Sequence, residues 1–535
     1  MRASARSARP NGTPTESDAP GSMKGSTQVV RTLRILTTGA VAMGCLLALL
    51  PAAGHDQMWL LYAAERVRHG AKLYGPELFE SNPPLIVWLS MVPSALAGWV
   101  HLPATAVGKL LVCVIGVVVA LGSRRMMLRV LKLSPAKELA LGFAYLTVFL
   151  VIPARDFGQR DQLLAILCLP YLVSAARAIT GVPVIGWRAW LVGLAAGVGI
   201  ALKPHQAVVV LGVEILVLAW TWRPRHLLRP EVLGLIAVGV LYAGAVWAFC
   251  PDYVTRILPL LRETYWAFGH LTWWGLVSEA IQLHVLAAAV LVGIAAAGVR
   301  QLSPMALVLA IAGLAGTFGY YLQRTGWYYQ QLPALTFLTL ALALVGTHFA
   351  ERRAWRVPRR APAAAWGLCL LAIGLTAHFM GYPFTPDRSF PVETPHPVLF
   401  SGLVSGTPVA TLTTTVDYTV PPVLKYHLTL AQRYPRLWLL PATLRAESGE
   451  RPMPAERLAV LEELQHDAML EDFVRWQPRL VLVERCQDPA VRCQVLEDRH
   501  DDLLKWFLED ARFRYEFSRY RYLRSAGRFD AYVLK

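Results

Sequence analysis

The stretch PAAGHDQMWLLYAAE, residues 51–65, stands where a long apolar run ends and acidic residues begin. The run at 34–54 has roughly the 20 residues that a helix needs to cross a bilayer. It carries no clear small-residue cleavage signature, so we interpret it as a membrane anchor rather than as a removed signal peptide. Asp56 and Glu65 follow directly. The sequence therefore predicts a membrane-spanning helix with carboxylates just beyond its end.

Apolar runs of similar length recur along the first two thirds of the chain. Of the 535 residues, 55% are hydrophobic and 16% are charged, whereas soluble domains carry about 25% charged residues. The predicted fold class is an α-helical polytopic membrane protein with a small α/β domain after the last span. We expect about eleven membrane-spanning helices, near residues 34–54, 101–122, 138–154, 162–178, 188–202, 206–222, 232–250, 278–299, 303–321, 331–348 and 363–381.

The net charge of +16 is unevenly distributed along the chain. From residue 383 onward, 20 Lys and Arg stand against 21 Asp and Glu, so the positive excess belongs to the preceding part. Positive residues concentrate in the cytoplasmic loops of membrane proteins. We therefore predict a multi-pass protein of the inner (plasma) membrane with a cytoplasmic N-terminus and an extracytoplasmic C-terminal domain, and no nucleic-acid partner. The basic residues gather in alternate connections, at Arg31 and Arg34, 123–132, Arg177 and Arg188, 222–230, Arg300 and 351–360.

Three parts follow from this topology. Residues 1–33 are expected to be a disordered cytoplasmic tail, 34–382 the transmembrane domain, and 383–535 an extracytoplasmic α/β domain with alternating strand-like and helical runs. In the first outer loop, 55–100, the apolar stretch 82–99 would invert the charge pattern if it crossed the membrane. We predict instead a juxtamembrane or re-entrant helix there, with Pro83 and Pro84 in its first turn. The stretch 251–275 has the apolar stripe of an interfacial helix.

Two cysteines lie in the predicted outer domain. Cys486 and Cys493 occur in VERCQDPAVRC, while the other five lie in or beside apolar spans. Disulfides form outside the cytoplasm, so we expect these two cysteines to be paired. Metal ligation by the pair is the open alternative, although no further cysteine follows in the chain.

Polar residues near the ends of the predicted spans collect on the outer face. Carboxylates and cations from four connections far apart in the sequence meet there, a combination that few purely structural helix bundles need. The residues are His55, Asp56, Glu65, Glu80 and Asn82 in the first loop, RDFGQRDQ at 155–162, KPHQ at 203–206, and Arg324, Tyr328, Tyr329 and Gln330 before the tenth span.

The order of these motifs resembles that of the C-type membrane glycosyltransferase superfamily (GT-C), in its protein O-mannosyltransferase and lipid A aminoarabinose transferase branch. Asp56 in HDQMWLLYAAE matches the acidic residue that closes the first span, and ESNPPLIVW at 80–88 matches a Pro-Pro-hydrophobic step before Trp. Asp161 in RDQLLAI matches a second acidic residue, and GVGIALKPH ends in the expected lysine, Lys203. The similarity covers about residues 34–350. It departs at Asn82, where the family has a basic residue.

This resemblance implies a polyprenyl-phosphate-sugar donor that is used on the outer side, with a glycan, lipid or protein as acceptor. A leaving lipid phosphate is anionic near neutral pH and needs cations, for which we predict Arg160, Lys203, His205 and Arg324. The acceptor hydroxyl needs a base, predicted to be Asp56. Asp161 is the second catalytic candidate. Acceptor or sugar contacts are assigned to Glu80, Asn82, Tyr329 and Gln330, and a divalent metal ion, if one takes part, to Asp56, Asp161 and Glu80.

Structural interpretations of the same residues stay open. Asp56 could cap the next helix, Asp156 and Arg160 could form an i, i+4 pair, and Lys203 could extend to the lipid headgroups. The main rival function is a transporter or flippase of a lipid-linked substrate, which should place charges near mid-membrane and show repeated halves. The nearest enzymatic alternative is a glycan polymerase or ligase.

Overall fold

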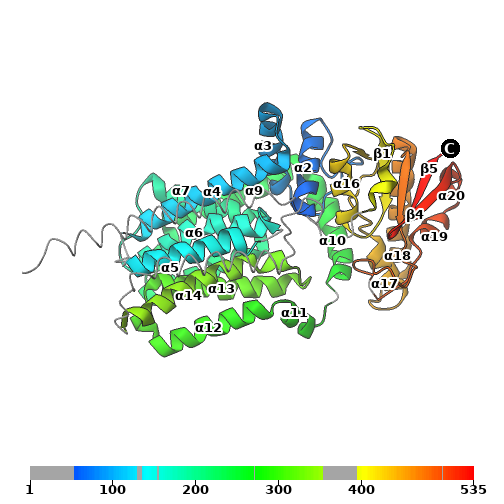
Figure 1. The fold of residues 1–535 in the computed structure, drawn as a ribbon. Coiled ribbons are helices and arrows are strands. Elements are labelled where there is room, and N and C mark those ends of the chain that lie inside the picture. The colour runs from blue at the N-terminus through cyan, green and yellow to red at the C-terminus, as the bar shows by residue number, and fades with distance from the viewer. Residues whose placement is uncertain (1–52, 129–134, 154–155, 270, 353–394, 497) are drawn as a thin grey trace, which may run out of the picture.

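The computed structural model describes residues 53–128, 135–153, 156–269, 271–352, 395–496 and 498–535. A helical bundle and a C-terminal α/β domain lie at opposite ends, with α2 (His55–Arg68), α3 (Leu85–Val100) and α10 (Leu258–Thr264) near their junction (Figure 1). The predicted tail 1–33, the predicted span 363–381 and almost all of the span 34–54 lie outside the described residues.

Each of the nine other predicted spans coincides with a helix. Among the described residues, six helices are long and apolar enough to cross a membrane, or seven if α11 (Trp273–Glu279) and α12 (Ile281–Ala297), bent by 77°, form one broken span. The count of eleven therefore stays a prediction. The bundle contains α4 (Ala104–Met127), α5 (Pro135–Leu146) with the turn η1 (Thr147–Val151), α6 (Arg160–Ile179), α7 (Trp187–Leu202), α8 (Ala207–Thr221), α9 (Pro230–Phe249), α12 (Ile281–Ala297), α13 (Pro304–Gln323) and α14 (Leu332–Arg352).

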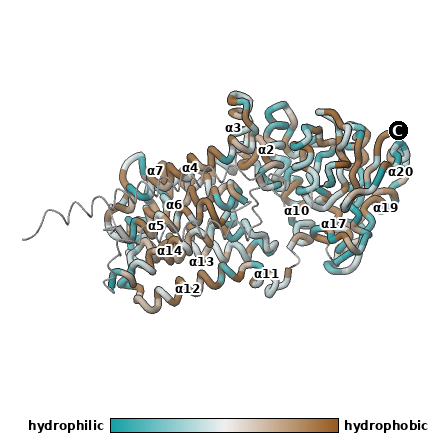
Figure 2. Tube along the Cα trace, viewed as in Figure 1, coloured by the Kyte–Doolittle hydropathy of each residue, from teal (hydrophilic) through white to brown (hydrophobic). Residues whose placement is uncertain are grey.

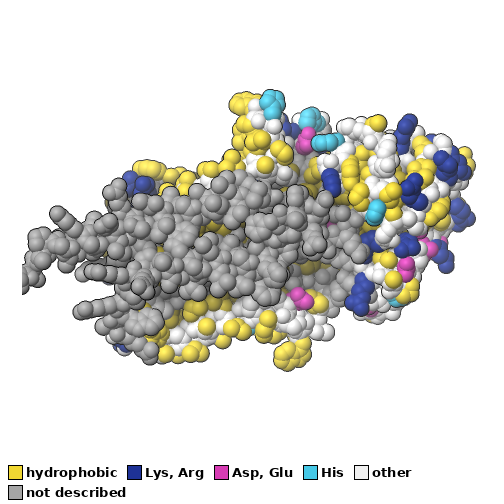
Figure 3. Space-filling model, viewed as in Figure 1, with side chains coloured by type: hydrophobic (Ala, Val, Ile, Leu, Met, Phe, Trp, Pro, Cys, Tyr) yellow, Lys and Arg dark blue, Asp and Glu magenta, His cyan; other side chains and the backbone are white. Residues whose placement is uncertain are grey.

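Small residues bring the bundle helices together. A Cβ atom on Gly193 of α7 would lie 2.1 Å from the carbonyl oxygen of Glu231 at the start of α9, and one on Gly197 would lie 2.7 Å from Val238 Cβ. Glycines thus let the two backbones approach, as in membrane helix pairs generally. The outer surface is apolar: Leu241 of α9 is 71% exposed. Figure 2 shows hydrophobic residues throughout the bundle, and Figure 3 shows them along its visible flanks, while Lys and Arg gather on the C-terminal domain.

At the end of the bundle away from Arg160, several basic residues form ion pairs with carboxylates. Arg229 Nη2 lies 2.5 Å from Glu214 Oε1, which also accepts a 2.6 Å hydrogen bond from Tyr171. Glu214 lies in the middle of the predicted span 206–222. Its pairing gives it a structural role at the end of α6 opposite to Arg160. The candidate site lies at the Arg160 end.

The first outer loop forms surface helices. The predicted helix at 82–99 is α3, which begins at Leu85 with Pro84 as the residue before its first turn. The stretch 251–275 is not the single helix that its stripe suggests. It divides into η5 (Tyr253–Ile257), α10, η6 (Tyr265–Phe268) and α11. Helical structure ends at Phe268, and a Cβ atom on the next residue, Gly269, would lie 3.1 Å from the carbonyl oxygen of Arg324.

The C-terminal domain contains a five-stranded mixed sheet of order β2-β1-β3-β5-β4. β1 is parallel to β2 and β3, and β5 is antiparallel to β3 and β4. The strand-like runs of the sequence at 408–415, 478–484 and 528–535 contain β1, β3 and β5. The elements are η10 (Pro397–Phe400), β1 (Pro408–Leu412), η11 (Val416–Tyr418), α16 (Val420–Lys425), β2 (Thr429–Leu430), α17 (Leu440–Glu447), α18 (Ala455–Trp476), β3 (Leu480–Glu484), α19 (Leu503–Leu508), α20 (Ala511–Phe517), β4 (Tyr520–Ala526) and β5 (Phe529–Leu534).

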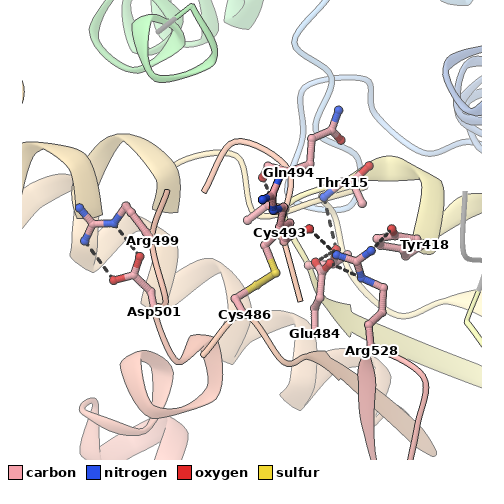
Figure 4. The surroundings of a disulfide bond; sticks show 12 residues. Thr415, Tyr418, Glu484, Cys486, Cys493, Gln494, Arg499, Asp501 and Arg528 are labelled. Carbon is pink, nitrogen blue, oxygen red and sulfur yellow. Dashed lines mark hydrogen bonds and ion pairs between the residues drawn. A yellow bond between two sulfur atoms is a disulfide. The ribbon is translucent and has the colours of Figure 1, made fainter. Parts of the chain in front are cut away.

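The expected disulfide joins Cys486 and Cys493 in the loop after β3 (Figure 4). Both cysteines are fully buried, and Glu484 lies beside them. These three residues are the one group in the described part of the chain whose ligand atoms would suit a metal ion. Because both sulfur atoms are held in the disulfide, the metal alternative for the pair does not fit this structure.

Candidate active site

Asp56 lies in the first turn of α2 and is held by its neighbour His55 and by Gln159. Its Oδ1 is 3.3 Å from His55 Nε2, and its Oδ2 accepts a 3.1 Å hydrogen bond from Gln159. The other ring nitrogen of His55, Nδ1, lies 2.7 Å from Asp417 Oδ1 of the C-terminal domain. The Asp56 side chain remains 25% exposed. The carboxylate is thus oriented on both oxygens and still accessible.

The charges around His55 fix its protonation and that of Asp56. Burial alone would lower the pKa of His55, but Asp417 and Asp56 raise it well above its usual value. Burial alone would raise the pKa of Asp56, but His55 and Arg160 lower it below its ordinary range. At neutral pH the site therefore holds an imidazolium between two carboxylates, and Asp56 is ionised.

Arg160 is linked to the first loop through Asn82. The guanidinium donates to Asn82 Oδ1, and Asn82 donates 2.7 Å and 2.6 Å hydrogen bonds from its backbone and side-chain nitrogens to Glu80 Oε1. Trp59 Nε1 donates to the other oxygen of Glu80. Asn82 therefore orients Arg160 although the family pattern has a cation there. Burial raises the pKa of Glu80, which is 1% exposed and serves as an internal acceptor.

Asp161 and Lys203 form a buried ion pair next to Arg160. Lys203 Nζ lies 3.2 Å from Asp161 Oδ2, donates a 3.1 Å hydrogen bond to Gln323 and lies 5.2 Å from the centre of the Tyr329 ring. Asp161 is fully buried and Lys203 is 7% exposed. A lysine that only reached toward headgroups would not be enclosed in this way. The ends of α6, α7 and α13 thus meet at these charges.

Three predicted site residues form no direct polar contact with Asp56 or Arg160 among the described residues. Arg324 is exposed, with its guanidinium 5.3 Å from the Trp273 ring centre. Gln330 is buried and exchanges hydrogen bonds with Thr325, which closes the loop before α14. His205 is half-buried just after Lys203. Within the described residues, no hydrogen bond or ion pair joins these three to Asp56 or Arg160.

The three carboxylates proposed as metal ligands do not converge. Asp56, Asp161 and Glu80 are absent from the groups of three ligands within 4.8 Å of one another that the described residues form. Each instead has a protein partner: His55 for Asp56, Lys203 for Asp161 and Asn82 for Glu80. These residues as arranged do not fit one shared divalent ion.

The sequence did not point to Asp417 or Arg436 of the C-terminal domain. Arg436 is 7% exposed and packs against two adjoining rings, 4.3 Å from the centre of Phe268 and 4.1 Å from that of Trp438. Burial lowers its pKa, while Tyr265 and Asp56 are close enough to oppose that effect. Both residues lie in a domain whose docking the sequence does not reveal.

Unsatisfied polar atoms are concentrated at this end of the bundle. Buried polar groups normally find hydrogen-bond partners, yet several here have none among the described residues. Such a concentration is typical of a site that binds a polar group. The atoms are Gln159 Oε1, Arg160 Nε, Asp161 Oδ1, His205 Nε2, Gln323 Nε2 and both polar side-chain atoms of Gln206.

Comparison with known proteins identifies the fold. No protein-family model matches the chain, and no curated protein matches it in sequence. The structure of apo ArnT from Cupriavidus metallidurans is similar over 94% of this chain and 98% of that chain, with 14% identity and a TM-score of 0.54.

Two further structures match with lower TM-scores. ArnT from the same organism bound to undecaprenyl phosphate has 14% identity, 93% and 97% coverage and a TM-score of 0.49. AglB from Archaeoglobus fulgidus, an archaeal oligosaccharyltransferase in complex with an inhibitory peptide and a dolichol-phosphate, has 13% identity, 94% and 74% coverage and a TM-score of 0.45. From its apolar helices and the likeness to apo ArnT, the chain is a multi-pass membrane protein with the GT-C glycosyltransferase fold that its motifs resemble.

Proposed function

We propose that the protein is an inverting glycosyltransferase that moves a sugar from a polyprenyl-phosphate donor to a glycan, lipid or protein acceptor outside the cytoplasm. The observation that carries this proposal is the closeness of the Asp56 carboxylate to the positive charge of Arg160. An ionised, accessible carboxylate lies within electrostatic reach of a buried guanidinium whose Nε has no partner among the described residues. The GT-C-like fold and the order of the motifs support the same reaction class.

The arrangement supplies what a one-step displacement needs. The acceptor oxygen attacks the anomeric carbon while its proton passes to Asp56, and the bond to the phosphate oxygen breaks with its electron pair left on the phosphate. Attack opposite to the leaving group inverts the anomeric centre. Gln159 and His55 each hold one oxygen of Asp56, so the base is positioned before the acceptor binds.

The leaving phosphate needs positive charge rather than a proton. Arg160 and Lys203 supply it from the ends of two neighbouring helices, α6 and α7. Asp161 keeps Lys203 in place through their 3.2 Å ion pair. In a site shielded from water, such preorganised cations stabilise developing negative charge far more than they would in solvent.

The proposed orientation places this site on the extracytoplasmic side of the inner membrane. The paired basic residues at the opposite end, among them Arg229 with Glu214, would then face the cytoplasm. The C-terminal domain, whose Asp417 reaches His55, would lie outside with its disulfide.

Asp56→Asn tests the proposal. This change keeps the size of the side chain but removes the base, and we expect transfer to fall by at least ~100-fold, as for general acid–base residues. Transfer is measured by mass spectrometry of envelope glycans from cells with and without the protein. Glu65→Gln is the matched control, because Glu65 is an exposed carboxylate on the same helix. Wild-type product levels from a well-expressed Asp56→Asn protein would refute the assignment.

A further inference from the structure

We propose that the C-terminal domain completes the active site, with Asp417 as a positioning residue that holds His55 against Asp56. This inference rests on the proposed function, since it concerns how the base of that reaction is oriented. It assigns a role in the reaction to a domain that is far from Asp56 in the sequence.

The geometry joins the three side chains in a row. Asp417 Oδ1 is 2.7 Å from His55 Nδ1, and His55 Nε2 is 3.3 Å from Asp56 Oδ1. Both ring nitrogens face carboxylates, so both act as donors only in the imidazolium form. A histidine held at both nitrogens keeps one ring orientation. Without Asp417, the ring could turn about its side-chain bonds and release Asp56 toward Arg160.

Asp417 is held in place by hydrogen bonds with Thr415, the residue before η11. Its side chain accepts a 3.0 Å hydrogen bond from Thr415 Oγ1, and its backbone nitrogen donates to the same oxygen at 3.3 Å. The neighbouring Thr414 Oγ1 donates a 2.6 Å hydrogen bond to the carbonyl oxygen of Gln494, next to Cys493. The carboxylate therefore sits on a turn that is tied to the loop closed by the disulfide.

A second contact fixes the other side of this turn (Figure 4). Arg528 Nη1 donates a 2.6 Å hydrogen bond to Tyr418 Oη, and Arg528 Nε lies 2.9 Å from Glu484 Oε1 at the end of β3. The turn η11 is thus held between the central strand of the sheet and the disulfide loop. Supporting contacts of this kind are what a residue needs if it is to orient a catalytic group.

Asp417→Asn tests the role of Asp417. The amide cannot support an imidazolium as a carboxylate does, so we expect the initial rate of glycan modification in isolated membranes to fall about 10- to 100-fold, as for other residues that orient a reacting group. The affinity of the purified protein for undecaprenyl phosphate, measured by native mass spectrometry, should stay within about 2-fold, because no phosphate contact changes. Asp417→Glu should recover part of the rate. Asp467→Asn on α18, a carboxylate paired with Arg512, is the matched control.

A double-substitution cycle shows whether Asp417 acts through His55. If it does, His55→Gln with Asp417→Asn should be no slower than His55→Gln alone. The inference would be overturned if the fold-loss of the double variant equalled the product of the two single losses, or if Asp417→Asn kept the wild-type rate. If Asp417→Asn proves unstable in thermal unfolding, the rates of His55→Gln and Asp417→Glu still test the inference. Wild-type rates in both variants would show that the contacts of His55 with Asp417 and Asp56 do not position the base.

The two proposals can fail separately. Full activity of Asp56→Asn refutes the proposed function and this inference with it. Loss of activity in Asp56→Asn together with wild-type activity in Asp417→Asn refutes only the inference about the C-terminal domain.

Discussion

At the scale of single residues, burial separates the cations that the sequence grouped together. Arg160, Lys203 and Arg324 all follow or begin apolar runs, and each is a reasonable phosphate ligand by position. In the structure, Arg160 and Lys203 are 6% and 7% exposed, whereas Arg324 is exposed against Trp273. The attraction between a cation and a phosphate is stronger where water is excluded. We therefore expect only Arg160 and Lys203 to contribute to binding of the donor phosphate.

Arg160→Gln and Arg324→Gln test this difference. We expect Arg160→Gln to weaken undecaprenyl phosphate binding by about 10-fold or more, since a charged hydrogen bond contributes about 1.5–3 kcal/mol. Arg324→Gln should change affinity by less than about 2-fold. Native mass spectrometry of the purified variants measures both. Equal losses in the two variants would show that exposure does not decide the role.

The sequence could identify residues whose position was set by the ends of apolar runs. Asp56, Asp161 and Lys203 belong to that class, because a charge at a span end must lie near a membrane surface. Asp417 and Arg436 could not be found in this way. They lie near Asp56 only because the C-terminal domain packs against the bundle. The spacing of residues within either part of the sequence does not predict that contact.

At the scale of elements, helix approach depends on a few glycines. α7 and α9 were predictable as apolar runs, but their packing partners were not, because apolar periodicity is weak in helices surrounded by lipid. Gly193 explains the contact: its Cβ position is occupied by the carbonyl oxygen of Glu231 at 2.1 Å. The end of the helical segment at Phe268 was likewise unpredictable, since the neighbouring Gly269 lies against the backbone of Arg324, a residue more than fifty positions away.

Gly193→Ala and Gly239→Ala form a matched pair on these two helices. Overpacking against backbone is expected to destabilise Gly193→Ala by about 1–3 kcal/mol. At Gly239 of α9 a Cβ atom meets nothing within 4 Å, so alanine should be neutral or stabilising by up to about 1 kcal/mol through helix propensity. Thermal unfolding in detergent compares them. A stable Gly193→Ala protein would mean that α7 and α9 pack less closely than described.

At the scale of the whole molecule, the bundle and the C-terminal domain meet around buried charge and aromatic rings. Arg457 of α18 pairs with Glu263 of α10 at 2.6 Å on the surface of this junction. Deeper in it, Arg436 packs against Phe268 and Trp438, with no hydrogen bond or ion pair to any described residue. The general class of the C-terminal domain was predictable from its strand-like and helical runs. Its attachment was not, because the contacts join residues far apart in the chain: 168 positions separate Phe268 from Arg436, and 362 separate His55 from Asp417.

Arg436→Met distinguishes a structural from a functional role for this guanidinium. Methionine keeps much of the apolar contact with the two rings, and removing an unpaired buried charge is expected to leave thermal stability unchanged or raised. The positive charge facing Asp56 is lost, so we expect glycan modification in isolated membranes to fall about 10-fold or more. Arg457→Met, at the exposed pair of the same junction, should alter neither quantity by much. If Arg436→Met instead lowers thermal stability and leaves the rate of glycan modification unchanged, Arg436 only stabilises the contact between the domain and the bundle. Its burial is then explained by its cation–π contacts with the two rings alone.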